Sequence, residues 1–373
     1  MMINAPDIEV NRIGHSGHIM LNRPKALNAL SGEMCRQISE VLMGWVDDDQ
    51  VHHVLITGAP GKAFCAGGDV RALVPVLKTN HDEACRYFES EYRLDLIINT
   101  FPKPIITLTN GLTMGGGSGV LLNARYQVIT ERMDFAMPET AIGLFPDVAA
   151  SIFLRRAPKS VGAFLGITGW RIGAGDMAAL GILDQATGVV VKSQEMDALT
   201  ETLTALEGSD NETISEAIWA AMQNAQITPE DHPIFDAQDW IDDHFSKPTI
   251  AAIRASLDGD DHPMANACRK AIDTRSPLSM AVTHHLLTAP EFAALTVPAA
   301  LALDYTLACR ITLKPDFIEG VRAVLIDKDN APKWQPSSIA DVTPLMVEEL
   351  FAEEGRLELH YPDGYNHSIA LKP

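Results

Sequence analysis

Short apolar runs alternate along the chain with longer segments whose apolar residues recur at helical spacing. Four of the runs are typical of buried strands, because they are rich in β-branched and apolar residues and are bounded by turn residues or charges. They are "VHHVLITG" (51–58), "KPIITLTNG" (103–111), "YQVIT" (126–130) and "TGVVVK" (187–192). Strands that alternate with helices predict an α/β fold.

Segment 31–46, ahead of the first strand, is a clear helix candidate. Ser31 stands where an N-cap residue is expected. The apolar residues of the segment recur every three or four positions, which predicts one buried face. They are Met34, Ile38, Val41, Leu42 and Trp45.

Beyond the fourth strand the character changes to acidic, helical segments. We therefore divide the chain into an α/β core (1–195), a helical insertion or extension (196–275) and a C-terminal helical region that packs on the core (276–373). Ser276 followed by Pro277 predicts the start of a helix, because serine caps helices and proline suits the first helical position.

Composition is that of an ordinary globular protein of 373 residues, with 46% hydrophobic and 21% charged residues. The formal net charge of −20 argues against nucleic-acid binding, since phosphate backbones require a basic surface. A few local cations and backbone N–H groups can still hold an anionic small molecule. No apolar run approaches the length of a membrane span. We expect neither nucleic acid nor a membrane as a partner.

Cysteine usage bears on the compartment. The five cysteines are odd in number and never spaced as C-x-x-C. This pattern predicts a reducing compartment, without a disulfide framework or a zinc site. The N-terminal stretch has neither an apolar signal core nor the Arg- and Ser-rich composition of a transit peptide. We expect a cytoplasmic protein that carries no metal or redox cofactor.

Glycine-rich turns follow the first two predicted strands. They are "APGKAFCAGGDVRAL" (59–73) and "GLTMGGGSGVLLNA" (111–124), and each leads into an apolar helix. Glycine lets backbone N–H groups face inward at a helix start, where unpaired N–H groups and the helix dipole favour negative charge. Two such N–H groups, aimed at one point from separate loops, would form an oxyanion hole.

The glycines do not fit either common nucleotide-binding motif. A nucleotide phosphate loop requires G-x-x-x-x-G-K-[ST], and no lysine follows Gly116 or Gly117. Gly115, Gly117 and Gly119 are spaced wrongly for the dinucleotide pattern G-x-G-x-x-G. Tight packing of helix on strand also uses glycine, so each loop alone leaves both a structural and a functional interpretation open.

The stretch "MPETAIGLFPDVAAS" (137–151) holds two acids, Glu139 and Asp147, in apolar surroundings. An ordinary structural interpretation exists for both. Glu139 would lie after Pro138 in the first turn of a helix, and Asp147 stands at an N-cap position. The functional interpretation is that both are held ready for catalysis, with their pKa raised by apolar neighbours.

These motifs resemble the crotonase, or enoyl-CoA hydratase/isomerase, superfamily and, within it, the 3-hydroxyisobutyryl-CoA hydrolases. The matching stretches follow the family's order over nearly the whole chain. They are "LNRPKALNALS" (21–31), "GKAFCAGGDVR" (61–71), "FESEY" (88–92), "GLTMGGGSG" (111–119), "MPETAIGLFPDV" (137–148) and "KPDFIEGVRAVLIDKDNAPKW" (314–334). The resemblance implies a crotonase-like spiral of ββα turns with a helical C-terminal part, across which an acyl-CoA thioester lies.

The resemblance also implies roles for particular residues. In the family, two backbone N–H groups hold the thioester oxygen, and on this chain they fall at Gly68 and Gly116. Typical enoyl-CoA hydratases carry one glutamate at the position of Glu139 and another at position 119, which is glycine here. One of the two carboxylates that deliver water to a C=C bond is therefore absent. The hydrolases share this pattern, with an aspartate eight residues after the retained glutamate, which Asp147 supplies.

The implied function is hydrolysis of a short branched 3-hydroxyacyl-CoA thioester, 3-hydroxyisobutyryl-CoA, as in valine breakdown. Gly68 and Gly116 would polarise the thioester carbonyl. Glu139 would either attack it to give a mixed anhydride or act as general base on water. Asp147 would orient Glu139, the water or the substrate hydroxyl. The alternatives are a hydratase/isomerase-type lyase and a non-catalytic CoA-binding homologue.

Further substrate contacts come from the same resemblance. Helical periodicity favours a solvated position for Glu91, whereas the resemblance implies that it lies in the substrate pocket, on the acyl hydroxyl. The CoA moiety, which is part of the substrate, is expected on matched residues of two loops. These are Lys25, Ala26, Ala66, Asp69 and Arg71. The family is often trimeric or hexameric, so the resemblance allows a homo-oligomer and leaves every state from monomer to hexamer open.

Overall fold

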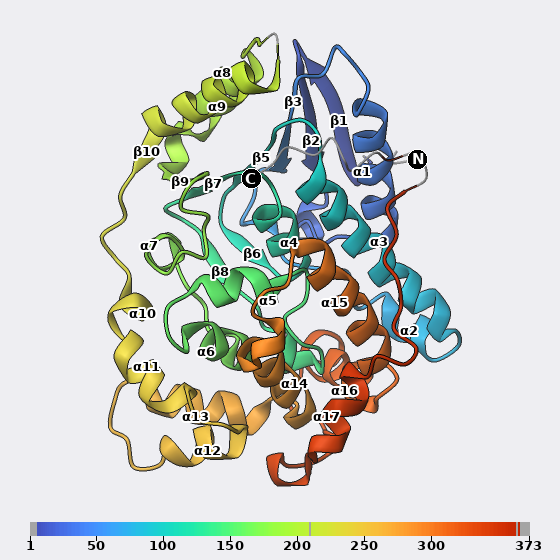
Figure 1. Cartoon of the computed structure of the whole chain (residues 1–373), viewed down its shortest axis with the longest axis vertical. Helices are drawn as coiled ribbons and strands as arrows, with labels where there is room; N and C mark the ends of the chain where they lie inside the picture. The colour runs from blue at the N-terminus through green and yellow to red at the C-terminus, as the bar shows by residue number, and fades with distance from the viewer. Residues whose placement is uncertain (1–5, 209, 363–364, 366–373) are drawn as a thin grey trace.

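The computed structural model describes residues 6–208, 210–362 and 365, and they form two sheets surrounded by helices (Figure 1). The larger sheet has the order β1-β2-β3-β5-β7-β9-β10, in which β1 and β10 pair antiparallel at the edges and the other neighbours are parallel. Its strands are β1 (Ile8–Ile13), β2 (Ser16–Leu21), β3 (His53–Gly58), β5 (Ile105–Thr109), β7 (Tyr126–Thr130), β9 (Gly188–Val191) and β10 (Gln226–Ile227).

The smaller sheet makes the fold a spiral. It contains three short parallel strands, β4 (Ala63–Cys65), β6 (Leu112–Met114) and β8 (Asp134–Ala136). Each directly follows a strand of the larger sheet, so the chain repeats a strand–strand–turn unit three times before β9. This arrangement confirms the predicted ββα spiral, and it brings the turns after β4, β6 and β8 to one edge of the smaller sheet.

The four predicted strands are confirmed to within two residues at each end. The hairpin of β1 and β2 and the three-residue strands of the smaller sheet were not predicted. Three residues are too few for a periodic signal, and β1 exposes most of its side chains. The short strand β10 lies in the part of the chain for which only helices were predicted.

Both predicted helix caps are present. Helix α1 (Gly32–Trp45) begins after Ser31, whose hydroxyl accepts a hydrogen bond from the backbone N–H of Met34. Helix α14 (Pro277–Thr288) begins after Ser276, whose hydroxyl accepts from the N–H of Ser279. A serine side chain at this position satisfies one of the N–H groups that a helix start leaves unpaired.

Two groups of helices follow β9 (Figure 1). Helices α8 (Met196–Thr204) and α9 (Asn211–Ala225) cover the larger sheet, in a cluster shared with side chains of β3, β5, β7 and β9. Four short helices then lie at the other end of the molecule, and α11 and α13 contact α6 (Val161–Thr168). They are α10 (Pro233–Asp236), α11 (Gln238–Phe245), α12 (Ile250–Ser256) and α13 (Ala265–Thr274). The domain boundaries at 195 and 275 stay a prediction.

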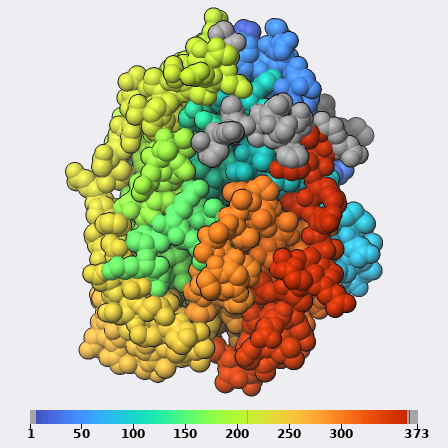
Figure 2. All heavy atoms as spheres, in the orientation of Figure 1, coloured from blue at the N-terminus to red at the C-terminus, as the bar shows by residue number. Residues whose placement is uncertain are grey.

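The C-terminal helices, orange and red in Figure 2, pack against the spiral on one face of the molecule. Helix α15 (Val297–Ile311) runs beside α3 (His81–Thr100). Within the described ranges, no helix is both long and apolar enough to cross a bilayer. The other helices are α2 (Leu73–Leu77), α4 (Gly116–Leu122), α5 (Ala150–Phe153), α7 (Ala174–Ala179), α16 (Pro315–Val321) and α17 (Pro344–Phe351).

A close backbone contact joins the spiral to the C-terminal part. Helix α16 lies on the 3₁₀ turn η2 (Glu139–Ile142). A Cβ atom on Gly320 of α16 would lie 2.6 Å from Cα of Ile142, and one on Gly143 would lie 2.6 Å from the backbone N of Phe317. Gly143 also has φ +76°, a conformation that glycine adopts at little cost. The two glycines therefore let backbone meet backbone beside Glu139.

Replacing Gly143 by alanine is expected to destabilise the protein by about 2 to 4 kcal/mol, because the new methyl group meets backbone and the φ angle is unfavourable. Thermal unfolding measures the change. The matched control is Gly44→Ala, in α1, where an added Cβ has nothing within 4 Å. Alanine there should stabilise the helix by up to about 1 kcal/mol. Equal melting temperatures for the two variants would contradict this account.

Candidate active site

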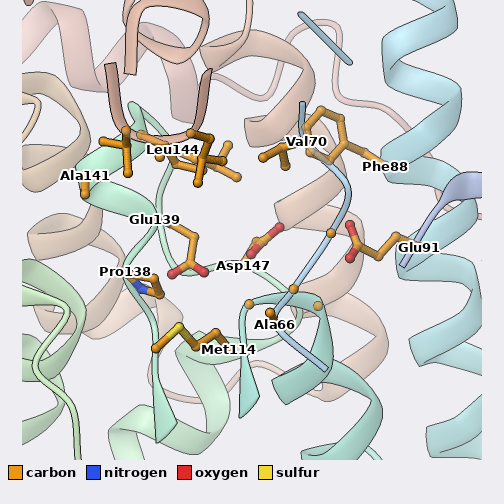
Figure 3. A pocket seen from close by; sticks show the side chains of 17 residues that line it. Ala66, Val70, Phe88, Glu91, Met114, Pro138, Glu139, Ala141, Leu144 and Asp147 are labelled. Atoms are coloured by element: carbon orange, nitrogen blue, oxygen red, sulfur yellow. The ribbon is translucent and has the colours of Figure 1, made fainter. Parts of the chain in front are cut away.

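A pocket of about 300 Å³ opens at the edge of the smaller sheet (Figure 3). Its walls come from both glycine loops, from α3, from η2 and the segment that follows it, and from the π-helical segment η6 (Arg322–Ile326). The lining residues are Ala66, Gly67, Gly68, Val70, Phe88, Glu91, Met114, Gly115, Gly116, Pro138, Glu139, Ala141, Ile142, Leu144, Asp147, Val324 and Leu325.

In the first glycine loop, one backbone N–H group points away from the neighbouring chain segment at Leu30. Leu30 donates its N–H to the carbonyl of Gly67 at 2.9 Å, and Asp69 donates its N–H to the carbonyl of Leu30 at 2.7 Å. Successive N–H groups of an extended chain alternate in direction. The N–H of Gly68 therefore points away from Leu30.

The second loop supplies another such group beside it. Gly116 is the first residue of α4, where an N–H group has no acceptor within the helix. A Cβ atom on Gly116 would lie 3.5 Å from the backbone N of Gly68. Within the described ranges, neither of these two N–H groups donates to a backbone carbonyl. Two unpaired amide donors thus lie side by side in the wall of the pocket.

Side chains of α3 explain why both positions are glycine. A Cβ atom on Gly116 would overlap Oε1 of Glu91, and one on Gly68 would overlap the hydroxyl of Tyr87. Tyr87 donates that hydroxyl to the carbonyl of Leu30 at 3.2 Å. The loops can approach α3 this closely only because they carry no side chain there.

Glu139 and Asp147 face the same space from the other side (Figure 3). Glu139 is 5% exposed and Asp147 is 4% exposed. Oε2 of Glu139 has no hydrogen-bond partner among the described residues. Asp147 accepts a hydrogen bond from the hydroxyl of Tyr92, on α3, at 2.6 Å. The two acids are thus brought together in the pocket with the two amide donors.

The predicted N-cap role of Asp147 is wrong. Helix α5 begins at Ala150 after Ala149, and no side chain caps it. Asp147 contributes only its backbone carbonyl, which accepts from the N–H of Ala150 at 2.9 Å. The chain between Asp147 and Ala150 bends through an unusual turn, and the side chain of Asp147 contacts Tyr92 instead. Glu139 does lie in a first helical turn, as expected, although that turn is only the four residues of η2.

The turn after Asp147 is strained. Val148 has φ +55° and Ala149 has φ +66°, and both values are unfavourable for residues with a Cβ atom, above all for valine. The N–H of Ala149 donates to Asp304 of α15 at 2.8 Å, and Asn123 donates its side-chain amide to the carbonyl of Val148 at 3.4 Å. Strain that surrounding contacts hold in place is typical of functional sites.

Burial sets the proton affinities of the pocket acids. It raises the pKa of Glu139 well above its ordinary value, and the neighbouring Asp147 raises it further, while Arg275 opposes the shift. Burial raises the pKa of Asp147 to about 6, against the hydrogen bond from Tyr92, which lowers it. The two acids titrate as a coupled pair, and burial together with their mutual repulsion favours a single negative charge shared between them over a range of pH.

Glu91 lies in the pocket, as the resemblance implies, and not in solvent, as periodicity favours. It is 4% exposed, because α3 is covered by α1 as well as by α15. Burial raises its pKa well above the ordinary value, and Asp147 raises it further. Its Oε1 has no hydrogen-bond partner in the described part of the chain.

The residues predicted for the CoA moiety are divided between the pocket and the surface. Ala66 lines the pocket, and its N–H donates to the carbonyl of Leu27 at 3.0 Å. Asp69 accepts from Arg23 at 2.9 Å and fixes the loop. The other three side chains are exposed, and they are Lys25 and Ala26, in the 3₁₀ turn η1 (Pro24–Ala26), and Arg71. The hydrogen bond between Ala66 and Leu27 brings η1 next to the glycine loop. Binding of the CoA moiety by the five predicted residues stays a prediction.

Sequence reasoning missed three buried residues that surround the site without lining the pocket. Tyr92 and Asp95 follow Glu91 on α3, and Asp304 lies on α15, and all three are buried. The available signal was an acid at spacing four from Glu91, which places Asp95 on the same helix face. Such spacing is common on exposed helices, so it does not by itself indicate a site.

Comparisons with known proteins agree with this architecture. Residues 16–351 match the Enoyl-CoA hydratase/isomerase family. Among curated relatives, 3-hydroxyisobutyryl-CoA hydrolase, mitochondrial, from Gallus gallus is 37% identical, with 95% of this chain and 91% of the relative covered. The Mus musculus protein of the same name is 38% identical, with 97% and 92% covered.

Solved structures show the same fold over almost the whole chain. A carnitinyl-CoA dehydratase from Mycobacterium thermoresistibile has a TM-score of 0.86 at 34% identity, covering 96% of this chain and 100% of that one. An enoyl-CoA hydratase from Rhodobacter sphaeroides 2.4.1 has a TM-score of 0.84 at 35% identity, covering 94% and 98%. This chain therefore belongs to the enoyl-CoA hydratase/isomerase, or crotonase, superfamily, and it is similar over nearly its full length to 3-hydroxyisobutyryl-CoA hydrolases.

Proposed function

We propose that this protein hydrolyses the thioester of 3-hydroxyisobutyryl-CoA, a short branched 3-hydroxyacyl-CoA, to the free acid and CoA. The observation that carries the proposal is one pocket that combines two unpaired amide donors, Gly68 and Gly116, with the buried acids Glu139 and Asp147. The names of the similar curated relatives support the same reaction.

The amide donors serve the carbonyl of the thioester. Attack on that carbonyl makes a tetrahedral intermediate whose oxygen carries a negative charge. Two preorganised N–H groups in a site shielded from water stabilise this charge at no cost in reorganisation. Gly68 and Gly116 are suited to this role because, among the described residues, no backbone carbonyl competes for their hydrogen atoms.

Glu139 is the group that starts the reaction, by one of two routes. As a nucleophile, its carboxylate bonds to the carbonyl carbon, the C–S bond breaks, and water then cleaves the mixed anhydride. As a general base, it takes a proton from a water molecule that attacks directly. Both routes require the ionised form of Glu139, and burial makes that form a stronger base.

Asp147 supports Glu139 and handles a proton. Its carboxylate, held by Tyr92, would orient Glu139, the attacking water or the substrate hydroxyl. Its pKa of about 6 suits it to pass a proton toward the leaving thiol near neutral pH.

The pocket walls fit a short acyl group with one hydroxyl. Val70, Phe88, Met114 and Leu144 give the cavity an apolar surface, and its volume of about 300 Å³ favours a small acyl chain. On the side opposite Glu139, Glu91 presents a carboxyl oxygen that has no partner among the described residues. As a residue that lines the pocket, Glu91 is the proposed partner of the substrate 3-hydroxyl.

Hydration of an enoyl-CoA is the second candidate, because the similar solved structures carry the names dehydratase and hydratase. Position 119 argues against it, since Gly119 provides no acid. Thiol release from 3-hydroxyisobutyryl-CoA and loss of enoyl absorbance from crotonyl-CoA, followed in parallel, separate the two reactions. Enoyl loss without thiol release would replace our proposal with hydration.

Glu139→Gln should reduce kcat for thiol release at least about 1000-fold, since the amide can neither attack nor accept a proton, and general-base or nucleophilic groups contribute this much or more. Thiol release from 3-hydroxyisobutyryl-CoA measures the loss. Glu216→Gln, the same substitution on the exposed side of α9, is the matched control and should retain full activity. An active Glu139→Gln enzyme would exclude both routes.

Tyr92→Phe should move the acidic limb of kcat/KM to higher pH by about one unit. The hydroxyl of Tyr92 stabilises the ionised form of Asp147, so its removal raises the pKa of Asp147 from about 6. As the pH is lowered, activity that requires the carboxylate of Asp147 is therefore lost at a higher pH in the variant than in the wild type. Tyr305→Phe, on α15 outside the pocket, should leave the limb in place. Coincident limbs in the wild type and Tyr92→Phe would rule out this contact as a determinant.

A further inference from the structure

Asp95 is a buried acid whose purpose the proposed chemistry does not explain. It lies on α3, one helical turn after Glu91, and it is 1% exposed. Its Oδ2 has no hydrogen-bond partner among the described residues. An unpaired polar atom in a protein interior is costly, so its retention calls for a specific reason.

The side chain of Asp95 lies against the glycine at position 119. A Cβ atom on Gly119 would be 2.6 and 2.8 Å from the two carboxyl oxygens of Asp95. The same atom would be 2.8 Å from Cβ of Val148. Asp95 and Val148 thus crowd the position that a Cβ atom of residue 119 would occupy, and glycine leaves room for both.

Val148 belongs to the strained turn that carries Asp147. Three elements hold this turn: α3 through Tyr92, α4 through Asn123 and α15 through Asp304. Asn123 also donates to the carbonyl of Gly119 at 3.0 Å, so α4 and the turn are bound together at the point where Asp95 packs.

We propose that Asp95 is a positioning residue, whose carboxyl group packs against Gly119 and Val148 and keeps the turn in the conformation that directs Asp147 into the pocket. This inference depends on the proposed hydrolysis only for its activity readout. The contact itself is a property of the folded protein.

The surroundings of Asp95 favour its neutral form. Among the described residues, no lysine, arginine or histidine contributes to its electrostatic environment, and every titratable neighbour is an acid or a thiol. These neighbours are Glu91 of α3, Asp147 of the turn, Asp304 of α15, Cys35 of α1 and Cys65 of β4. Burial, followed by the charges of Glu91 and Asp147, raises the pKa of Asp95 well above its ordinary value. A protonated carboxyl keeps the shape of the contact and adds no charge beside Asp147.

A double-mutant cycle tests the contact without any substrate. Asp95→Ala empties the space and Gly119→Ala overfills it, so each should lower Tm by at least about 3 °C. In the double variant the new methyl group of residue 119 occupies the space that Asp95 vacates. The loss of Tm in the double variant should therefore be smaller than the sum of the two single losses. Additive losses would show that the two residues do not share this space and would overturn the proposal.

Activity distinguishes positioning of Asp147 from general support of the fold. Asp95→Ala should reduce kcat about tenfold or more with little change in KM, because a small displacement of Asp147 is costly. Asp176→Ala is the matched control. Asp176 is a buried acid of α7 that accepts from the N–H groups of Ile234 and Phe235, and it does not line the pocket. It should lower Tm without lowering kcat, whereas an equal loss of kcat in both variants would overturn the proposal.

The neutral state has its own test in Asp95→Asn, which keeps the size of the side chain and cannot ionise. Its kcat should stay within about twofold of wild type, and the acidic limb of kcat/KM should not move. A limb displaced to lower pH would mean that Asp95 is ionised in the wild type, because removing a negative charge lowers the pKa of Asp147. A wild-type protein that releases no thiol from 3-hydroxyisobutyryl-CoA would refute the proposed hydrolysis. The double-mutant cycle in Tm would still test the contact between Asp95 and Gly119.

Discussion

The site depends on the close approach of two backbone turns to helix α3. Gly68 and Gly116 can lie against Tyr87 and Glu91 only because neither carries a side chain. This approach places two N–H groups next to one another with no backbone acceptor among the described residues, which is a stable arrangement only at a surface that a polar ligand or water can reach. The rest of the spiral, with its paired long and short strands, supplies the rigid frame that keeps the two turns in register.

A second consequence of this packing is a concentration of buried acids. Glu91, Asp95, Glu139, Asp147 and Asp304 come from four separate segments and meet near one pocket. Arg275 is a cation that acts on one of them, Glu139. Because several negative charges cannot be sustained together in a poorly solvated region, protons are shared among these carboxyls. Such a group is unfavourable for stability but suits a reaction in which protons move between water, carboxylate and thiol.

Much of this organisation was predictable from the chain. The apolar runs located β3, β5, β7 and β9, and the glycine motifs after the first two of them marked the turns that meet in the pocket. Periodicity failed at Glu91, because it treats a helix as having one exposed face, whereas α3 is covered by both α1 and α15. It could not identify Asp95 or Asp304 either, since their burial depends on contacts between segments far apart in sequence. The strained turn after Asp147 has no local signal, because alanine and valine do not favour its conformation.

The pocket is completed by Val324 and Leu325, which lie far downstream of every other residue that lines it. During synthesis, the spiral with its glycine turns and acids emerges from the ribosome well before these two side chains. Until the C-terminal third has folded back over η2, that surface remains an open apolar cleft. Enzymatic competence is therefore tied to completion of the polypeptide, and a truncated product would expose the apolar and acidic side chains that line a pocket in the full-length protein.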